Sequence, residues 1–225
     1  MKRLLVMGLL LTACVAVQPV RIAIPATAVA VEGANPRVWN QPISFGDWRT
    51  ASVNEGTTRS FLFDLGILDV GKTDQAYRMV LQGPGQQTDV ECHMREVIVG
   101  SAGVFVQASL GKEPILVCGL SRKGYRTVLA LTRTGRPEPS LVGELRQVGG
   151  ATYDVRSIHR AATGGIPSGE PFGYEIVRDE RALAVVETVN RGRVWIDPDA
   201  PNRDDLAAAA AALLLWTPSE VEGPS

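Results

Sequence analysis

The chain has 225 residues, and its 23 Lys and Arg nearly balance its 24 Asp and Glu, giving a net charge of −1 at pH 7. It has no basic field, and aromatic residues make up only 6% of it, so we expect no nucleic-acid partner. Hydrophobic residues make up 45%, which suffices for the packed core of one domain or two. Two His and three Cys provide few soft metal ligands, and we predict no metal site and no cofactor.

The N-terminal segment has the features of an export signal. Lys2 and Arg3 are followed by an uncharged apolar run over 4–13 and then by Cys14. A short apolar run behind a cationic start is typical of secretory signal peptides. The tetrapeptide Leu11-Thr12-Ala13-Cys14 resembles the lipobox of bacterial lipoproteins. The resemblance implies a signal peptide over 1–13 and a lipid anchor on Cys14. Because no Asp follows that cysteine, it also implies delivery to the outer membrane.

The following segment, residues 14–42, contains several Pro and many small residues, and we predict that it is a lipid-anchored tether. One alternative stays open, because the apolar stretch over 22–31 contains Ala28-Val29-Ala30, an acceptable site for ordinary signal peptidase. A cut after Ala30 would release a secreted protein without Cys14. A spanning helix is disfavoured, because residues 4–17 fall short of the roughly 20 that a span needs.

Short β-rich runs separated by Gly, Pro, Asn and Asp begin at residue 43. In the run over 88–97, apolar and polar residues alternate, so that Cys92 faces one way and His93 the other. Short strands at close spacing favour a sandwich or a barrel over alternating strands and helices. We predict twelve strands, over 43–50, 58–65, 76–82, 88–97, 103–108, 115–119, 125–132, 140–147, 151–159, 171–178, 182–189 and 193–197.

A helix is predicted over 203–216. Asn202 is a candidate N-cap, and Asp204 and Asp205 suit the positive end of the helix dipole. From Leu206 onward the run is apolar on every side, so it must be buried on every side. We therefore predict a mainly β fold, a closed or nearly closed antiparallel barrel of about 12 strands around one hydrophobic C-terminal helix. The domain would span 43–217, with a tail over 218–225. Two alternatives stay open for the helix: it could lie across the face of a β-sandwich, or it could be an alanine tract with no packing role.

The C-terminal part of the chain also carries a family resemblance. The stretches 174–177, 182–189 and 193–196, followed by the Asp-Asp-Leu-Ala helix, resemble the end of the tubby-like C-terminal fold, a group that includes scramblase-type and plant LURP-type proteins. The resemblance implies a 12-stranded barrel around a hydrophobic C-terminal helix. Tubby domains bind phosphoinositides through clustered basic residues. Here the densest basic group is Arg122-Lys123 with Arg126, in an acidic chain, so that function is not carried over.

Cys92 and Cys118 lie in two predicted strands and remain as a pair once Cys14 is lipidated. An oxidising compartment would allow a disulfide between them, which would stabilise the fold by roughly 3.5 kcal/mol on the loop-entropy scale. The alternative is two buried thiols.

No residue pattern predicts a catalytic site. His93 is expected on an exposed strand face, and His159 precedes a Gly-rich loop. Residues 119–124, with the letters GLSRKG, lack the Gly-Lys-Ser/Thr ending of a phosphate loop and are interpreted as a hairpin turn. Of the carboxylate pairs, Asp179/Glu180 lies between two predicted strands and is interpreted as a solvated loop charge, whereas Asp197/Asp199 is interpreted as part of the loop that leads into the helix.

These expectations favour a non-catalytic envelope lipoprotein. It would be a membrane-tethered β module whose partner is a protein or a small ligand, in addition to the membrane itself. The alternatives are a lipid-handling protein, by analogy of fold, and an envelope hydrolase using His93 or His159 with a carboxylate. A helix that fills the barrel would leave no interior cavity, so a ligand would have to bind outside.

Overall fold

The computed structural model describes residues 21–33, 42–55, 59–64, 69–84, 86–101, 104–107, 114–134, 140–164 and 167–216. The predictions for the signal peptide, for Cys14 and for the tail over 218–225 lie outside these residues. Of the predicted tether, the structure describes 21–33 and residue 42.

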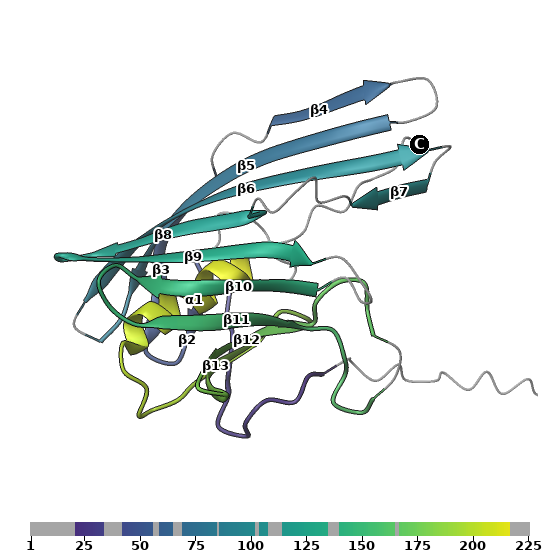
Figure 1. Cartoon of the computed structure of the whole chain (residues 1–225). Coiled ribbons are helices and arrows are strands. Elements are labelled where there is room, and N and C mark those ends of the chain that lie inside the picture. The colour runs from purple at the N-terminus through teal and green to yellow at the C-terminus, as the bar shows by residue number, and fades with distance from the viewer. Residues whose placement is uncertain are drawn as a thin grey trace, which may run out of the picture.

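Antiparallel strands and one helix make up this part of the chain (Figure 1). The sheet order is β1-β14-β13-β12-β11-β10-β9-β8-β6-β5-β3-β2, with β4 paired to β5 and β7 paired to β6. The strands are β1 (Val29–Ala30), β2 (Ser44–Phe45), β3 (Trp48–Glu55), β4 (Arg59–Asp64), β5 (Asp69–Gln82), β6 (Gln87–Ser101), β7 (Val104–Gln107), β8 (Leu116–Arg122), β9 (Tyr125–Thr134), β10 (Ser140–Gln147), β11 (Thr152–Ile158), β12 (Gly173–Arg178), β13 (Arg181–Glu187) and β14 (Arg193–Ile196), and the helix is α1 (Arg203–Leu215).

The twelve strands of this path form a nearly closed barrel, which confirms the predicted fold class. At the seam, β1 pairs with β14, and two backbone hydrogen bonds between Glu32 and Ser44 join the end of the β1 segment to β2. The long strands β5 and β6 continue past the barrel wall, and Figure 1 shows them projecting with β4 and β7 at their sides. The outer surface of the sheet is thereby extended beside the closed part.

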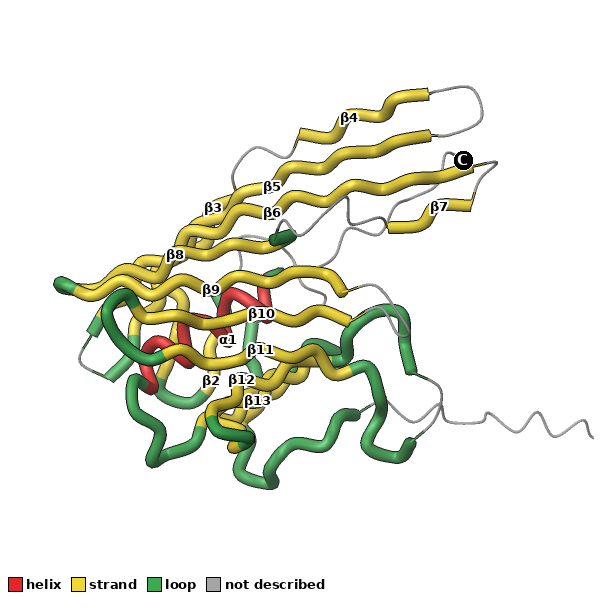
Figure 2. Tube along the Cα trace, viewed as in Figure 1, coloured by secondary structure: helices red, strands yellow, loops and turns green. Residues whose placement is uncertain are grey.

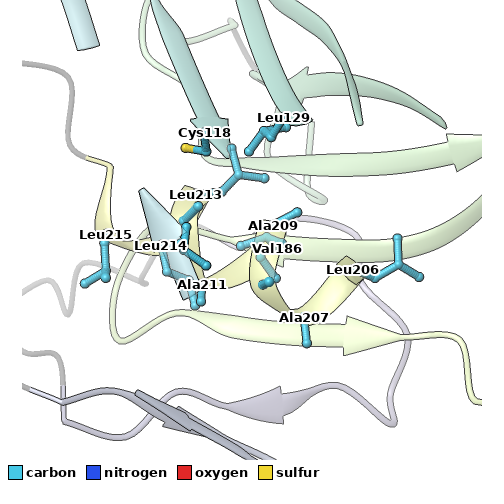
Figure 3. Close-up of a cluster of buried hydrophobic side chains, with 14 of the residues drawn as sticks. Cys118, Leu129, Val186, Leu206, Ala207, Ala209, Ala211, Leu213, Leu214 and Leu215 are labelled. Carbon is cyan, nitrogen blue, oxygen red and sulfur yellow. The ribbon is translucent and has the colours of Figure 1, made fainter. Parts of the chain in front are cut away.

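Helix α1 runs inside the barrel and fills it (Figure 2). Every side chain from Asp205 to Trp216 is buried. Alanine keeps the middle of the helix thin, so the barrel wall can approach it from all sides, and the leucines of its last turn are buried as well. In Figure 3, Leu213 lies on the side of the helix toward Cys118, and Val186 lies beside the helix as well. The interior is therefore a packed core.

Polar groups close the barrel at the N-terminal end of α1. Arg122 donates to the Asp204 carboxylate at 2.9 Å and lies 3.6 Å from Asp205. The Thr127 hydroxyl donates to Asp205 at 2.9 Å. The indole of Trp48 donates to Asp204 at 3.3 Å. The predicted dipole partners are thus also the points that fix the helix to the wall.

The predicted N-cap at Asn202 is wrong in its chemistry. Asn202 precedes the helix, but its side chain makes no capping hydrogen bond. Its backbone is left-handed, with φ of 58°, and its amide instead donates to Gln147 at 3.2 Å and to the Tyr153 hydroxyl at 3.3 Å. Bonding to the barrel wall replaces bonding to the first turn.

The folded unit also begins before the predicted boundary at residue 43. Ile22 and Val31 are buried, and β1 is hydrogen-bonded to β14. The Ile22 amide donates to Oε1 of the buried Glu187 carboxylate at 3.2 Å, and Arg193 donates to both oxygens of that carboxylate. The described residues of the predicted tether therefore pack on the barrel, because burial of Ile22 and Val31 and the pairing of β1 with β14 hold them at the seam.

Candidate functional site

A groove lies on the outer face of β3, β5, β6, β8 and β9, with a volume of about 570 Å³. Most of the residues that line it face away from α1; Met79 and Val90, which belong to the core, also border it. Its polar lining consists of Ser52, Asn54, Arg78, Asp89, Glu91, His93, Ser121 and Arg126, and its apolar lining includes Val117 and Val128 around Gly119.

Strand register explains why the groove is hollow. Across the sheet, one row runs from Asn54 through Arg78, Glu91 and Gly119 to Val128. In this row Gly119 follows the long side chains of Arg78 and Glu91 and has no side chain of its own. A Cβ added to it would meet no atom closer than a guanidinium nitrogen of Arg126, at 4.0 Å. The hollow is thus an unfilled side-chain position on a curved sheet.

A second row lies next to the first and carries opposite charges. It runs from Ser52 through Val80, Asp89 and Ser121 to Arg126. Residues two apart on a strand share a face, so this row and the row through the glycine open to the same side. The groove therefore offers a carboxylate, a hydroxyl and a guanidinium in order across three neighbouring strands.

Two of the charges in the groove neutralise each other. Arg78 donates to Glu91 at 2.6 Å, and the imidazole of His93 lies 3.4 Å from the same carboxylate. The hydrogen bond from Arg78 holds the pKa of Glu91 below its usual value, with a smaller contribution from His93. Glu91 therefore stays ionised at neutral pH and is occupied by its neighbours.

Arg126 differs from Arg78, because no hydrogen bond or ion pair from its guanidinium is formed with the residues that the structure describes. Its nitrogen comes close to the position of a Cβ on Gly119, so the side chain bends over the groove floor. The groove thus holds one engaged and one available guanidinium.

The disulfide lies directly beneath the groove. Cys92 and Cys118 are opposed across β6 and β8, with a Cα–Cα distance of 4.0 Å, and their sulfurs are bonded. Both are fully buried, while their strand neighbours Glu91 and Gly119 face outward. The crosslink therefore ties together the two strands that carry the centre of the groove floor, and its burial keeps it away from thiol reagents.

His159 lies outside the groove, so the structure does not bring the two histidines together. The nitrogens of its ring hydrogen-bond the Ser157 hydroxyl and the Ser168 carbonyl, each at 2.8 Å. The Ser157 oxygen also accepts the Leu141 amide at 2.8 Å. This arrangement fastens the loop after β11 to the barrel.

The carboxylate pairs named from the sequence have local partners. Glu180 pairs with Arg156 and is exposed, whereas Asp197 is buried, pairs with Arg181 and accepts the Asp199 amide. Asp197 therefore lies in the turn that leads toward α1, as predicted, and its buried carboxylate organises that turn. Among the residues that the structure describes, no group of three or more His, Cys, Asp or Glu could hold a metal ion.

Sequence reasoning placed His93 correctly on an exposed face but missed the rest of the groove. Residues 119–122 were assigned to a hairpin turn, whereas they belong to β8 and the turn lies at Lys123-Gly124. The usable signal was a glycine inside a strand, which often marks a place where something approaches the backbone closely.

No helix in the described part of the chain has both the length and the hydropathy to cross a membrane. Comparison of the chain with models of protein families, with curated proteins and with solved structures finds no match.

Proposed function

We propose that the protein is a non-catalytic bacterial envelope lipoprotein, anchored through Cys14, whose barrel binds a ligand in the groove on its outer face. The observation that carries the proposal is the packed interior: α1 occupies the space that other barrels use for a ligand. Binding therefore falls to the outer surface, where the groove is hollow, polar and backed by a disulfide.

The seam of the barrel supports cleavage before Cys14 over cleavage after Ala30. A cut after Ala30 would remove Ile22, which is buried and bonded to Glu187, and β1, which pairs with β14. The barrel would lose its closing strand. A cut before Cys14 keeps all of these contacts.

The groove chemistry supports binding over catalysis. A general base must be able to reach a substrate proton, and a carboxylate that orients it must be available. Glu91 is already shared between Arg78 and His93, and Ser157, which is bonded to His159, does not line the groove that holds His93. The packed interior likewise argues against carriage of a lipid inside the barrel.

Fractionation of cells tests the anchor. Wild-type protein is expected in the membrane fraction and to be released by the Cys14→Ser change, because the lipid has lost its attachment atom. Release of the wild type, or membrane retention of the variant, would refute anchoring at this residue.

A thermal-shift screen tests the groove. Amino acids, short peptides, sugars, organic acids and dispersed lipids would each be added to the wild type, to Gly119→Trp and to Val142→Trp. The first variant fills the groove, and the second adds the same indole to an exposed position on β10 outside it. A ligand of the groove stabilises the wild type and Val142→Trp but not Gly119→Trp. Absence of any such compound would contradict ligand binding there.

A further inference from the structure

The charges of the groove narrow the class of ligand. Asp89, Ser121 and Arg126 follow one another across β6, β8 and β9. We propose that the groove binds a short zwitterionic peptide, with its carboxylate on Arg126 and its ammonium on Asp89. This inference rests on the proposed function of the groove.

Arg126 supplies the site for the carboxylate. A guanidinium forms two parallel hydrogen bonds to a planar carboxylate, and it does so best where no protein acid already occupies it. Its nitrogen lies 4.0 Å from the position of a Cβ on Gly119. A carboxylate held there lies over the groove floor, within reach of the Ser121 hydroxyl on the neighbouring strand.

Asp89 supplies the opposite end. It is exposed, and within the described part of the chain it accepts one side-chain hydrogen bond, a long one of 3.3 Å from the Gln87 amide, so its carboxylate can receive a cation. Glu91 lies two residues further along the same strand and is neutralised by Arg78, so Asp89 is the acid of the groove that faces no arginine partner among the described residues. The remaining charges, one negative on Asp89 and one positive on Arg126, favour a ligand with one charge of each sign over a dianion such as a phosphate monoester.

The spacing of the two charges sets the ligand length. Their Cα atoms lie two strands apart, about 10 Å at the usual strand spacing, and this is an upper limit for the distance between the charges because the Arg126 guanidinium bends back over Gly119 on β8. An extended peptide gains about 3.4 Å per residue, so a peptide of two or three residues keeps its charged ends within this limit. Gly119, Val117 and Val128 leave room beside the backbone for small apolar side chains.

Calorimetric titration of the purified full chain with trialanine, N-acetyl-trialanine and trialanine amide tests the inference. Trialanine is expected to bind, and each blocked peptide is expected to bind about tenfold more weakly because one charge pair is lost. Arg126→Gln should lower the affinity for trialanine about tenfold and leave the affinity for trialanine amide unchanged, because the amide has no carboxylate to lose. Asp89→Asn should lower the affinity for trialanine and leave the affinity for N-acetyl-trialanine unchanged, because the acetylated peptide has no ammonium group. Arg146→Gln, which changes an exposed arginine outside the groove, should change none of these affinities.

The zwitterion assignment would be overturned if the three peptides bound equally well or if trialanine did not bind. It would also be overturned if either variant lowered the affinity for trialanine and for the corresponding blocked peptide by the same factor. Failure of the assignment is distinguishable from failure of the proposed function. In the first case another compound class still stabilises the protein in a Gly119-dependent way; in the second no class does.

Discussion

The inner and outer faces of the same strands differ in what they allow. On β6 and β8 the inward residues, including Cys92 and Cys118, are fully buried against α1, whereas the outward residues line an open polar groove. The inner face is complete: apolar side chains, a crosslink and a helix leave no room for a ligand. The outer face has space and an unpaired charge for a ligand, since Gly119 has no side chain and the described residues do not pair with the Arg126 guanidinium beside it. The packed interior thus stabilises the barrel, whereas the polar groups that can bind a ligand lie on its outer face.

The same acidic residue placed on each face gives the sharpest contrast. Ala210→Glu buries an unpaired carboxylate at a position with no exposed surface, and its cost of several kcal/mol approaches the whole stability of a domain. Gly119→Glu places the carboxylate in the groove beside Arg126. Circular dichroism melting should show an unfolded or strongly destabilised first variant and a near-native second one. Near-native melting of Ala210→Glu would contradict the enclosed helix.

Removal of the disulfide tests what joins the two faces. The double variant Cys92→Ala, Cys118→Ala should lose roughly 3.5 kcal/mol of unfolding free energy, because the unfolded chain is no longer constrained. Denaturant unfolding under non-reducing conditions measures the loss. Mass spectrometry of non-reduced peptides should find the two cysteines linked in the wild type, and free thiols there would contradict the crosslink.

Tyr77→Phe tests the hydrogen bond that holds the C-terminal end of α1. The Tyr77 hydroxyl donates to the Ala212 carbonyl at 2.8 Å, and its loss should cost about 1–2 kcal/mol in denaturant unfolding at neutral pH. Burial raises the pKa of Tyr77 far above its usual value. The folded state therefore keeps this proton when the unfolded state releases it, so stability falls as pH rises past about 10. The variant should lose less stability than the wild type over that range.

The smallest effect is expected on the outer face. Arg78→Gln removes the hydrogen bond that lowers the pKa of Glu91, so that pKa should rise toward its ordinary value. In the wild type the ion pair contributes above the ordinary pKa of Glu and is lost as pH falls through the lowered one. Carboxyl NMR titration measures the change in pKa. The melting temperature should move less than in Tyr77→Phe, since both groups are exposed.

Much of the fold could be predicted from the sequence, because the spacing of apolar and polar residues along a short segment indicates whether it forms a strand or a helix and which side is buried. Alternation identified β6, and the unbroken apolar run from Leu206 required burial on all sides. The candidate site could not be predicted in the same way. His93 was placed on an exposed face, but Arg126 and Asp89 become neighbours of one groove only through the register of β6, β8 and β9.

The sequence by itself determined that a helix without a polar side must be enclosed and that β-strands must enclose it, because buried area and backbone hydrogen bonding leave few other solutions. Tertiary structure alone decided where the barrel closes, that residues 21–31 belong to it, and which charges share the groove. The reason is physical. Strand register sets contacts between residues far apart in the chain, and a shift of one residue would turn each of these side chains to the opposite face.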